Sequence, residues 1–193
     1  MRLKRLLLSG YRNYDHLDLP VTSDLCLFVG DNAQGKTNLL EAVYFLATAR
    51  SFRAGRDDEL IRWGGQEALM SCVVEREVAE SSIAIRVSRG KPKHITVNGQ
   101  KLRRHIDLLG HLNVVTFSPD DLQLVKGGPA ERRRFLDMEL AQISPSYRHD
   151  LTTYERVLRQ RNNLLKEMDE RRVSSDVLLA WDAQLVEVGS RIM

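Results

Sequence analysis

The sequence has few of the features that mark secreted, metal-binding or membrane proteins. It contains only two cysteines, Cys26 and Cys72, and both stand in apolar stretches, which indicates core residues rather than a disulfide or a metal pair. Its five histidines have no ligand spacing, so we expect no metal site from them. No stretch approaches the ~20 apolar residues that span a bilayer, and the short apolar run after Met1 has no cleavage site. We therefore expect a soluble, cytoplasmic protein without a membrane partner.

A strong excess of one charge is also absent. The chain has 29 Lys and Arg against 26 Asp and Glu, which gives a net charge of +3 and a pI near 9.0. This slight basic character is compatible with a nucleic-acid partner without demonstrating one. A length of 193 residues with 42% hydrophobic residues is enough for one good core and a smaller second lobe.

One stretch carries the clearest functional signal. It fits the phosphate-loop pattern G-x-x-x-x-G-K-[ST] without a mismatch and consists of Gly30, Asp31, Asn32, Ala33, Gln34, Gly35, Lys36 and Thr37. The apolar run 25–29 before it predicts a buried strand that enters the loop. Residues 37–50 after it predict a helix, because apolar residues recur there at helical spacing. Strand, loop and helix in this order indicate a site for a nucleoside triphosphate.

The residue types in this loop suit a phosphate. Gly30 and Gly35 allow the backbone to curl around an anion, and the N-terminus of the following helix adds partial positive charge. Lys36 is placed to reach the β- and γ-phosphates, and the Thr37 hydroxyl to bind Mg²⁺. ATP and Mg²⁺ are therefore the expected cofactors. The alternative, a chance glycine turn before a core helix, does not explain the Lys-Thr pair.

Two strands are expected ahead of the loop, at residues 3–9 and 16–20, joined by a turn at residues 10–13. Small P-loop kinases usually place the loop after their first strand, whereas ATP-binding-cassette (ABC) ATPases have two strands before it. The order of elements therefore favours an α/β P-loop NTPase of the ABC type.

The rest of the chain predicts an antiparallel sheet followed by helices. Strands with one solvent-facing side are expected at residues 68–76, 82–87 and 94–97. A short helix and a buried strand are expected next, at 102–110 and 113–117. A helix capped by Ser118 and broken by Gly127-Gly128-Pro129 is expected next. Three more follow it, one from residue 129, one over 148–170 and one over 175–192. We expect an ATP-binding lobe over residues 1–143 and the start of a helical lobe over 144–193.

Segments outside the phosphate loop carry a resemblance to a known family. The most specific is residues 119–137, with the sequence PDDLQLVKGGPAERRRFLD. Shorter ones are Tyr11-Arg12-Asn13, Asn32 in the loop, Leu40-Glu41-Ala42 and residues 49–53. Together these segments resemble the RecF family, which belongs to the SMC-like branch of the ABC ATPases. The resemblance covers the chain from its first strand to about residue 165.

The resemblance implies both a fold and a function. The fold would be an α/β, ABC/SMC-like P-loop NTPase, with a mixed sheet around the phosphate loop, an antiparallel β subdomain and a helical lobe. The function would be ATP-dependent binding of single-stranded or gapped DNA, without sequence specificity, in replication and recombinational repair. The protein would support recombinase loading and the SOS response, as a homodimer that sandwiches two nucleotides and with RecR and RecO as partners. Arg12 and Asn13 would lie beside the nucleotide, Arg12 touching phosphate or adenine; a plain polar turn is the alternative.

Two motifs that such ATPases need for hydrolysis do not occur in this sequence. They are a Walker B strand that ends in Asp-Glu and a Leu-Ser-x-Gly-Gln-like signature. Asp120 and Asp121 follow the strand expected at 113–117, but Ser118-Pro119 interrupt the connection and indicate a helix cap instead. We assign no catalytic residue. The chain resembles the N-terminal part of a RecF, and we expect it to bind ATP without efficient hydrolysis.

Scattered basic residues could add a DNA-facing surface. The candidates are Arg53, Arg56, Lys91, Lys93, Arg132 and Arg133, although solvated surface is the ordinary interpretation of such residues. Two other classes of function compete. A small P-loop phosphotransferase would usually carry an extra glycine within residues 32–34, and a transporter ATPase subunit would need an adenine-stacking aromatic residue and the absent signature motif.

Overall fold

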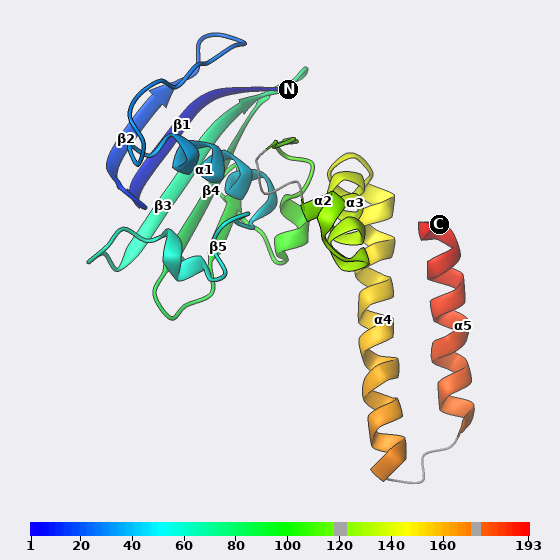
Figure 1. Ribbon diagram of the computed structural model, residues 1–193. Helices are drawn as coiled ribbons and strands as arrows, with labels where there is room; N and C mark the ends of the chain where they lie inside the picture. Colours follow the sequence, from blue (N-terminus) through cyan, green and yellow to red (C-terminus); the bar gives the residue numbers. More distant parts are fainter. Residues whose placement is uncertain (118–122, 171–174) are drawn as a thin grey trace. The chain divides into compact units, whose positions relative to one another are not determined.

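The computed structural model describes residues 1–117, 123–170 and 175–193 (Figure 1). The chain divides into two units, Met1–Thr116 and Phe117–Met193. The lobe boundary that we expect between residues 143 and 144 falls inside the second unit.

The first unit is built on a six-stranded sheet in which every neighbouring pair of strands is antiparallel. The strands are β1 (Arg2–Tyr11), β2 (Tyr14–Pro20), β3 (Glu67–Glu75), β4 (Glu80–Ser88), β5 (His94–Val97) and β6 (Gln100–Lys101). Their order across the sheet is β2-β1-β3-β4-β5-β6. The five strands predicted in these regions are confirmed; β6 adds a short return after the tight turn predicted at Asn98-Gly99, where both residues have positive φ.

One face of this sheet is covered by a helix, and the other face is exposed to solvent. Helix α1 (Lys36–Thr48) packs against β3 and β4 and lies across the sheet in Figure 1. Alternate residues of β3, such as Met70 and Cys72, are buried in the same core as Phe45 and Leu46 of α1. Period-two burial of this kind is what a half-buried strand requires. Burial also raises the pKa of the Cys72 thiol to about 12, so this cysteine is the core residue that its context predicts.

Two single turns of 3₁₀ helix complete the first unit. They are η1 (Asp57–Leu60) and η2 (His105–Leu108). The second lies where the sequence predicts a short helix over 102–110. Leu60 and Leu108 are fully buried, so both turns close over the core.

Two apolar segments that we predict as buried strands are not strands, and this part of the prediction is wrong. Residues 25–29 and 113–117 have no assigned secondary structure, and Leu25, Leu27 and Phe117 are 84%, 83% and 92% exposed. An apolar run forms a buried strand only where neighbouring strands bond to its backbone and a layer covers its side chains. The six described strands pair with one another and not with these segments, so the described sheet is antiparallel rather than mixed.

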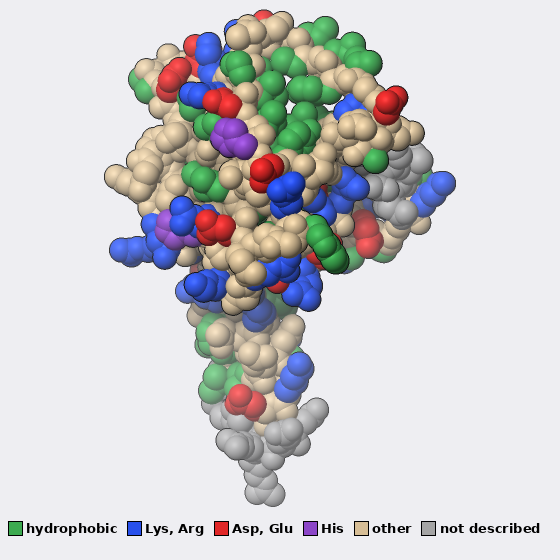
Figure 2. Space-filling model, turned by 90° about the vertical axis from the view of Figure 1, so that its left-hand side faces the viewer, with side chains coloured by type: hydrophobic (Ala, Val, Ile, Leu, Met, Phe, Trp, Pro, Cys, Tyr) green, Lys and Arg blue, Asp and Glu red, His purple; other side chains and the backbone are tan. Residues whose placement is uncertain are grey.

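The same cause explains two further features. Cys26, predicted as a core residue, is exposed because the segment that carries it is exposed. Figure 2 shows hydrophobic side chains, in green, open on the surface of the molecule.

The second unit is helical. Its helices are α2 (Gln123–Lys126), α3 (Pro129–Ile143), α4 (Pro145–Glu170) and α5 (Ser175–Ile192). Helices α4 and α5 run antiparallel, because Arg161 pairs with Asp182 while Arg191 pairs with Asp150. The three helices predicted from residue 129 onward are confirmed. The predicted cap at Ser118 and the acidic pair Asp120-Asp121 lie outside the described residues.

In the described ranges, no helix has both the length and the apolar character that crossing a bilayer requires.

Candidate nucleotide-binding site

The phosphate loop lies between the exposed segment 25–29 and α1, which begins at Lys36 with Gly35 as its N-cap. Ala33 and Gly35 have positive φ, of 65° and 101°. At Gly35 an added Cβ would come within 2.6 Å of the Asn13 side chain, so this position needs glycine for space as well as for conformation. The turn that precedes β2 therefore sits directly on the loop.

The start of α1 offers an anion site. No side chain caps the helix, and its first turn contains no acidic residue. The first N–H groups of a helix have no partner inside it and carry partial positive charge, so an anion is their natural partner. Lys36 Nζ donates to the carbonyl oxygens of Gly30 and Asp31 at 2.7 and 2.6 Å, which folds the ammonium group over the loop. Thr37 is exposed beside it.

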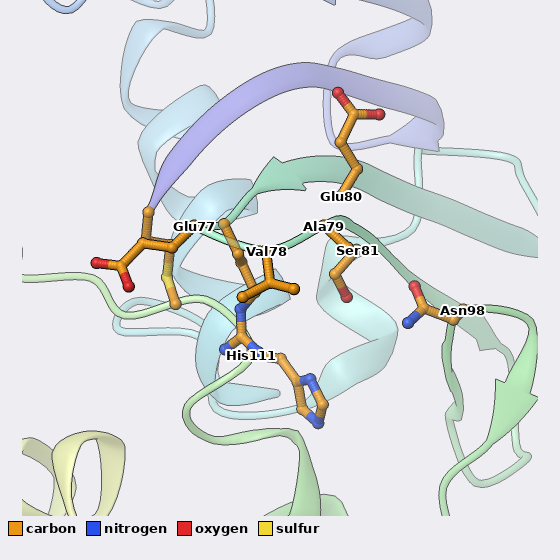
Figure 3. Close-up of a pocket in the computed structure, with 9 residues that line it drawn as sticks. Glu77, Val78, Ala79, Glu80, Ser81, Asn98 and His111 are labelled. Atoms are coloured by element: carbon orange, nitrogen blue, oxygen red, sulfur yellow. The ribbon is translucent and has the colours of Figure 1, made fainter.

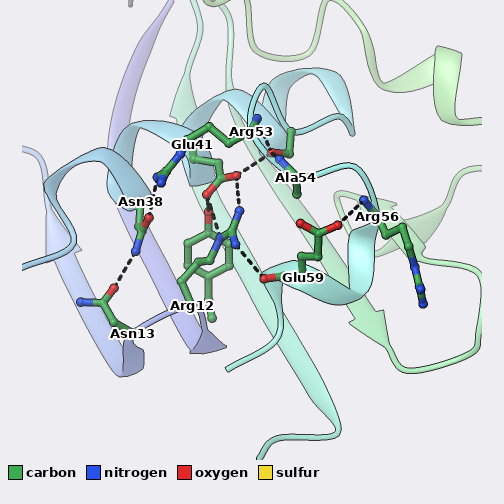
Figure 4. A network of polar contacts seen from close by, with 10 residues as sticks. Arg12, Asn13, Asn38, Glu41, Arg53, Ala54, Arg56 and Glu59 are labelled. Atoms are coloured by element: carbon green, nitrogen blue, oxygen red, sulfur yellow. Dashed lines mark hydrogen bonds and ion pairs between the residues drawn. The ribbon is translucent and has the colours of Figure 1, made fainter. Parts of the chain in front are cut away.

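Arg12 and Asn13 are adjacent in the turn but have different partners. Asn13 Nδ2 donates to the carbonyl oxygen of Gln34 in the loop, at 3.1 Å. Arg12 instead forms an ion pair with Glu41 of α1, with 2.7 Å between Nη2 and Oε1 and 3.0 Å between Nε and Oε2 (Figure 4). Asn13 therefore contacts the loop, and its expected place beside the nucleotide stays a prediction. A contact between Arg12 and nucleotide stays a prediction, since its guanidinium group is bonded to Glu41.

Sequence reasoning assigns no role to Glu41 and Asn38, the two residues that connect this turn to the helix. Glu41 is fully buried, and Asn38 Nδ2 donates to Asn13 Oδ1 at 2.9 Å. A signal for Glu41 does exist in the sequence, because it falls on the apolar face of a helix, where a carboxylate needs a cationic partner. The signal for Asn38 is weaker, since an asparagine near a helix start is common.

The candidate DNA-binding residues lie in both units, with Arg132 and Arg133 in the second and the others in the first. Arg56 is 77% exposed beside Asp58, and Lys91 is exposed. Lys93 is less accessible, because its side chain is 11% exposed and its Nζ bonds to Asp57 and to the Ala49 carbonyl, at 2.9 and 2.6 Å. A half-buried lysine paired with a carboxylate presents less charge to a DNA backbone, and its contact with DNA stays a prediction.

The remaining candidates, Arg53, Arg132 and Arg133, are more exposed than Lys93. Arg53 Nη1 donates to Asn38 Oδ1 at 3.1 Å, while Arg132 donates to the carbonyl oxygens of Leu124 and Gly127 in its own unit. Arg133 is exposed.

A cavity of about 520 Å³ lies elsewhere in the first unit, at the turn between β3 and β4 (Figure 3). Residues that line it include Met1, Arg76, Val78, Ser81, Asn98 and His111. No residue of the phosphate loop, and neither Arg12 nor Asn13, lines it. This cavity is therefore not the nucleotide site.

Comparison with known proteins defines the class. Residues 2–128 match the RecF/RecN/SMC N-terminal domain family. An Smc head solved with the C-terminal winged-helix domain of ScpA shares the fold, with a TM-score of 0.54 over 70% of this chain and 50% of that chain, at 23% identity. The antiparallel sheet, the loop and α1 thus form part of an ABC/SMC-like head. The chain belongs to this RecF/RecN/SMC N-terminal domain family.

The curated relatives carry the name DNA replication and repair protein RecF. The chain is 42% identical to that of Lachnoclostridium phytofermentans over 193 residues and 45% identical to that of Halalkalibacterium halodurans over 192 residues. These matches include all of this chain but 54% and 52% of the relatives, so the chain spans about half their length. The solved structure of the recombination mediator protein RecF with ATP, a protein of the RecFOR pathway, superposes with a TM-score of 0.91 at 36% identity. The match covers 98% of this chain and 51% of that chain. The predicted family and the ABC/SMC-like fold class are confirmed.

Proposed function

We propose that this chain is the ATP-binding module of a RecF-type protein of DNA replication and repair. The observation that carries the proposal is the geometry of the phosphate loop. An uncapped helix N-terminus and the folded-back ammonium group of Lys36 converge on it, and both favour an anion with several charges. The solved RecF relative that holds ATP supports the choice of nucleotide.

The residues present also fit Mg²⁺. Thr37 follows Lys36 directly and is exposed at the start of α1, where its hydroxyl would hold the ion. Mg²⁺ held there would neutralise part of the charge of the phosphates.

ATP affinity should therefore depend on magnesium through Thr37. Calorimetric titration with ATP should give binding about tenfold tighter with Mg²⁺ than with EDTA, a difference of ~1.4 kcal/mol. Thr37→Val keeps the shape of the side chain and removes the hydroxyl, so it should abolish the magnesium effect and leave binding in EDTA unchanged. Equal affinities for the unmodified chain with and without Mg²⁺ would contradict the assignment.

The wider role proposed is recombinational repair in the cytoplasm. As part of the whole protein, the chain would form an ATP-dependent homodimer, bind single-stranded or gapped DNA, and support recombinase loading and the SOS response with RecR and RecO. Identity of 42–45% to RecF proteins and the RecFOR pathway of the solved relative support this role.

DNA binding by this chain should be weak, salt-dependent and independent of sequence. The exposed candidates, such as Arg56 and Lys91, can contact phosphates, which carry no sequence information. A rise in salt from 50 to 200 mM should weaken binding to single-stranded DNA at least about tenfold in fluorescence anisotropy. Arg56→Ala with Lys91→Ala should weaken it further on every sequence tested. Selection of a defined consensus from random duplexes would refute the proposal.

A further inference from the structure

The side chain of Glu41 is the centre of a buried polar network on the side of α1 that faces the turn at residues 10–13 (Figure 4). Its Oε2 accepts hydrogen bonds from Tyr11 Oη and Arg12 Nε, both at 3.0 Å. Its Oε1 accepts from Arg12 Nη2 at 2.7 Å and from Ser51 Oγ at 2.5 Å. Both carboxylate oxygens are thus fully engaged, and three separate segments meet at one charge.

Glu41 is ionised in this network. Burial alone would raise the pKa of its carboxyl group, but the hydrogen bonds from Arg12 and Ser51 and the charge of Arg12 outweigh burial and hold the pKa below its ordinary value. Replacing either partner of such a pair by a neutral residue leaves the charge of the other partner uncompensated. The network therefore depends on the carboxylate.

The turn that Glu41 holds has a constrained backbone. Arg12 has a φ of 50°, a conformation that residues other than glycine rarely adopt, and Gly10 has a φ of 61°. Two backbone hydrogen bonds of 2.8 Å, from Arg12 N to Leu60 O and from Arg62 N to Gly10 O, fix the turn on its outer side. The ion pair with Glu41 fixes it on the inner side. A strained turn persists only where its surroundings determine it in this way.

The far end of this turn touches the phosphate loop. Asn13 Nδ2 donates to the Gln34 carbonyl oxygen, and Tyr14 Oη donates to the Gly35 carbonyl oxygen at 3.3 Å. Asn38, two residues after Lys36, orients the Asn13 amide by donating to its Oδ1. A continuous path of contacts therefore runs from Glu41 through Arg12 and Asn13 to the loop backbone.

We infer that Glu41 is a positioning residue for the nucleotide site: by holding Arg12 it places Asn13 on the Gln34 carbonyl and so fixes the shape of the phosphate loop. This inference rests on the proposed ATP binding at the loop. According to this inference, Glu41 does not itself contact the nucleotide. In this arrangement Arg12 acts on the nucleotide site indirectly, because it links Glu41 to the turn that carries Asn13.

The test compares ATP affinities of folded variants by calorimetry, with Mg²⁺ present and well below the unfolding temperature of each. Glu41→Gln keeps the shape of the side chain but removes the charge, and Asn13→Ala removes the contact with the loop from an exposed position. Each should weaken ATP binding about tenfold, in line with one lost charge-assisted or loop-orienting hydrogen bond. Because both act along one path, the double variant should lose about tenfold rather than about a hundredfold.

A matched control separates this effect from simple loss of stability. Asp57→Asn breaks the ion pair of Lys93, which braces the other end of α1 at the Ala49 carbonyl. It should lower the melting temperature in circular dichroism and leave ATP affinity unchanged.

The outcomes distinguish this inference from the proposed function. Absence of ATP binding by the unmodified chain would refute the proposed function itself. If the unmodified chain binds ATP and Glu41→Gln binds it with the same affinity, only the positioning role is overturned. Asn13→Ala takes the place of Glu41→Gln in this comparison if Glu41→Gln does not fold. Additive losses in the double variant would overturn the path through Asn13.

Discussion

Replacement of Lys36 by alanine should remove ATP binding almost completely. The ammonium group lies over the loop, within 2.7 Å of two loop carbonyl oxygens, and a bound nucleotide would supply phosphate oxygens to the same donors. Charge-assisted hydrogen bonds contribute about 1.5–3 kcal/mol each, so loss of Lys36 should weaken binding on the order of a hundredfold or more. Calorimetric titration with ATP and Mg²⁺ should show no measurable heat for this variant at micromolar protein.

Lys91→Ala is the matched control for this measurement. It removes one lysine charge from an exposed turn of the same unit, outside the loop, and should bind ATP as the unmodified chain does. Circular dichroism should show both variants folded, because neither side chain belongs to the core. An unchanged affinity in Lys36→Ala would mean that the nucleotide, if bound, is held elsewhere.

The antiparallel sheet and the loop could be predicted because their signals are local. Alternating apolar residues, such as Ile83 and Ile85 of β4, fix which face of a strand is buried, and Asn98-Gly99 fixes a tight turn. The phosphate loop is a contiguous motif whose glycines and lysine act through their own backbone and side chain. Each of these predictions needs only neighbours in sequence.

The segments 25–29 and 113–117 could not be predicted correctly because a buried strand depends on partners that its own sequence does not specify. Val29 and Val115 are as apolar as Ile83, yet they are 83% and 80% exposed, while Ile83 is fully buried between paired strands. The contact of Arg12 with Glu41 is also non-local, since the two residues are 29 positions apart. Apolar side chains favour burial, but a segment becomes a buried strand only where neighbouring strands pair with its backbone.

The phosphate-loop motif predicts nucleotide binding, but it does not by itself predict hydrolysis. Lys36 and Thr37 would account for holding phosphates and Mg²⁺, whereas cleavage requires an oriented water and neutralisation of charge on the γ-phosphate. Glu41 is the carboxylate on α1 nearest in sequence to these residues. It is buried and bonded to Tyr11, Arg12 and Ser51, so it is unsuited to orient a water.

The 193-residue chain should therefore bind ATP but release phosphate no faster than its Lys36→Ala variant, with or without DNA. The motifs that orient the attacking water and complete the site from a partner molecule do not occur in its sequence. A chain extended to the full length of its RecF relatives should show slow, DNA-stimulated turnover that depends on dimer formation. A coupled phosphate-release assay on the purified proteins, at saturating ATP and Mg²⁺, measures both rates.

The outcome that contradicts this prediction points to specific residues. Robust turnover by the 193-residue chain alone, lost in Lys36→Ala, would mean that a carboxylate within it orients the water. Asp120 and Asp121 are the candidates, since they follow the apolar segment 113–117 after Ser118-Pro119. Asp120→Asn and Asp121→Asn would then be expected to lower turnover at least about a hundredfold while leaving ATP affinity unchanged, because loss of a group that acts only in the transition state lowers the rate without weakening binding. Our interpretation of residues 118–121 as a helix cap rather than a Walker B carboxylate pair would then be wrong.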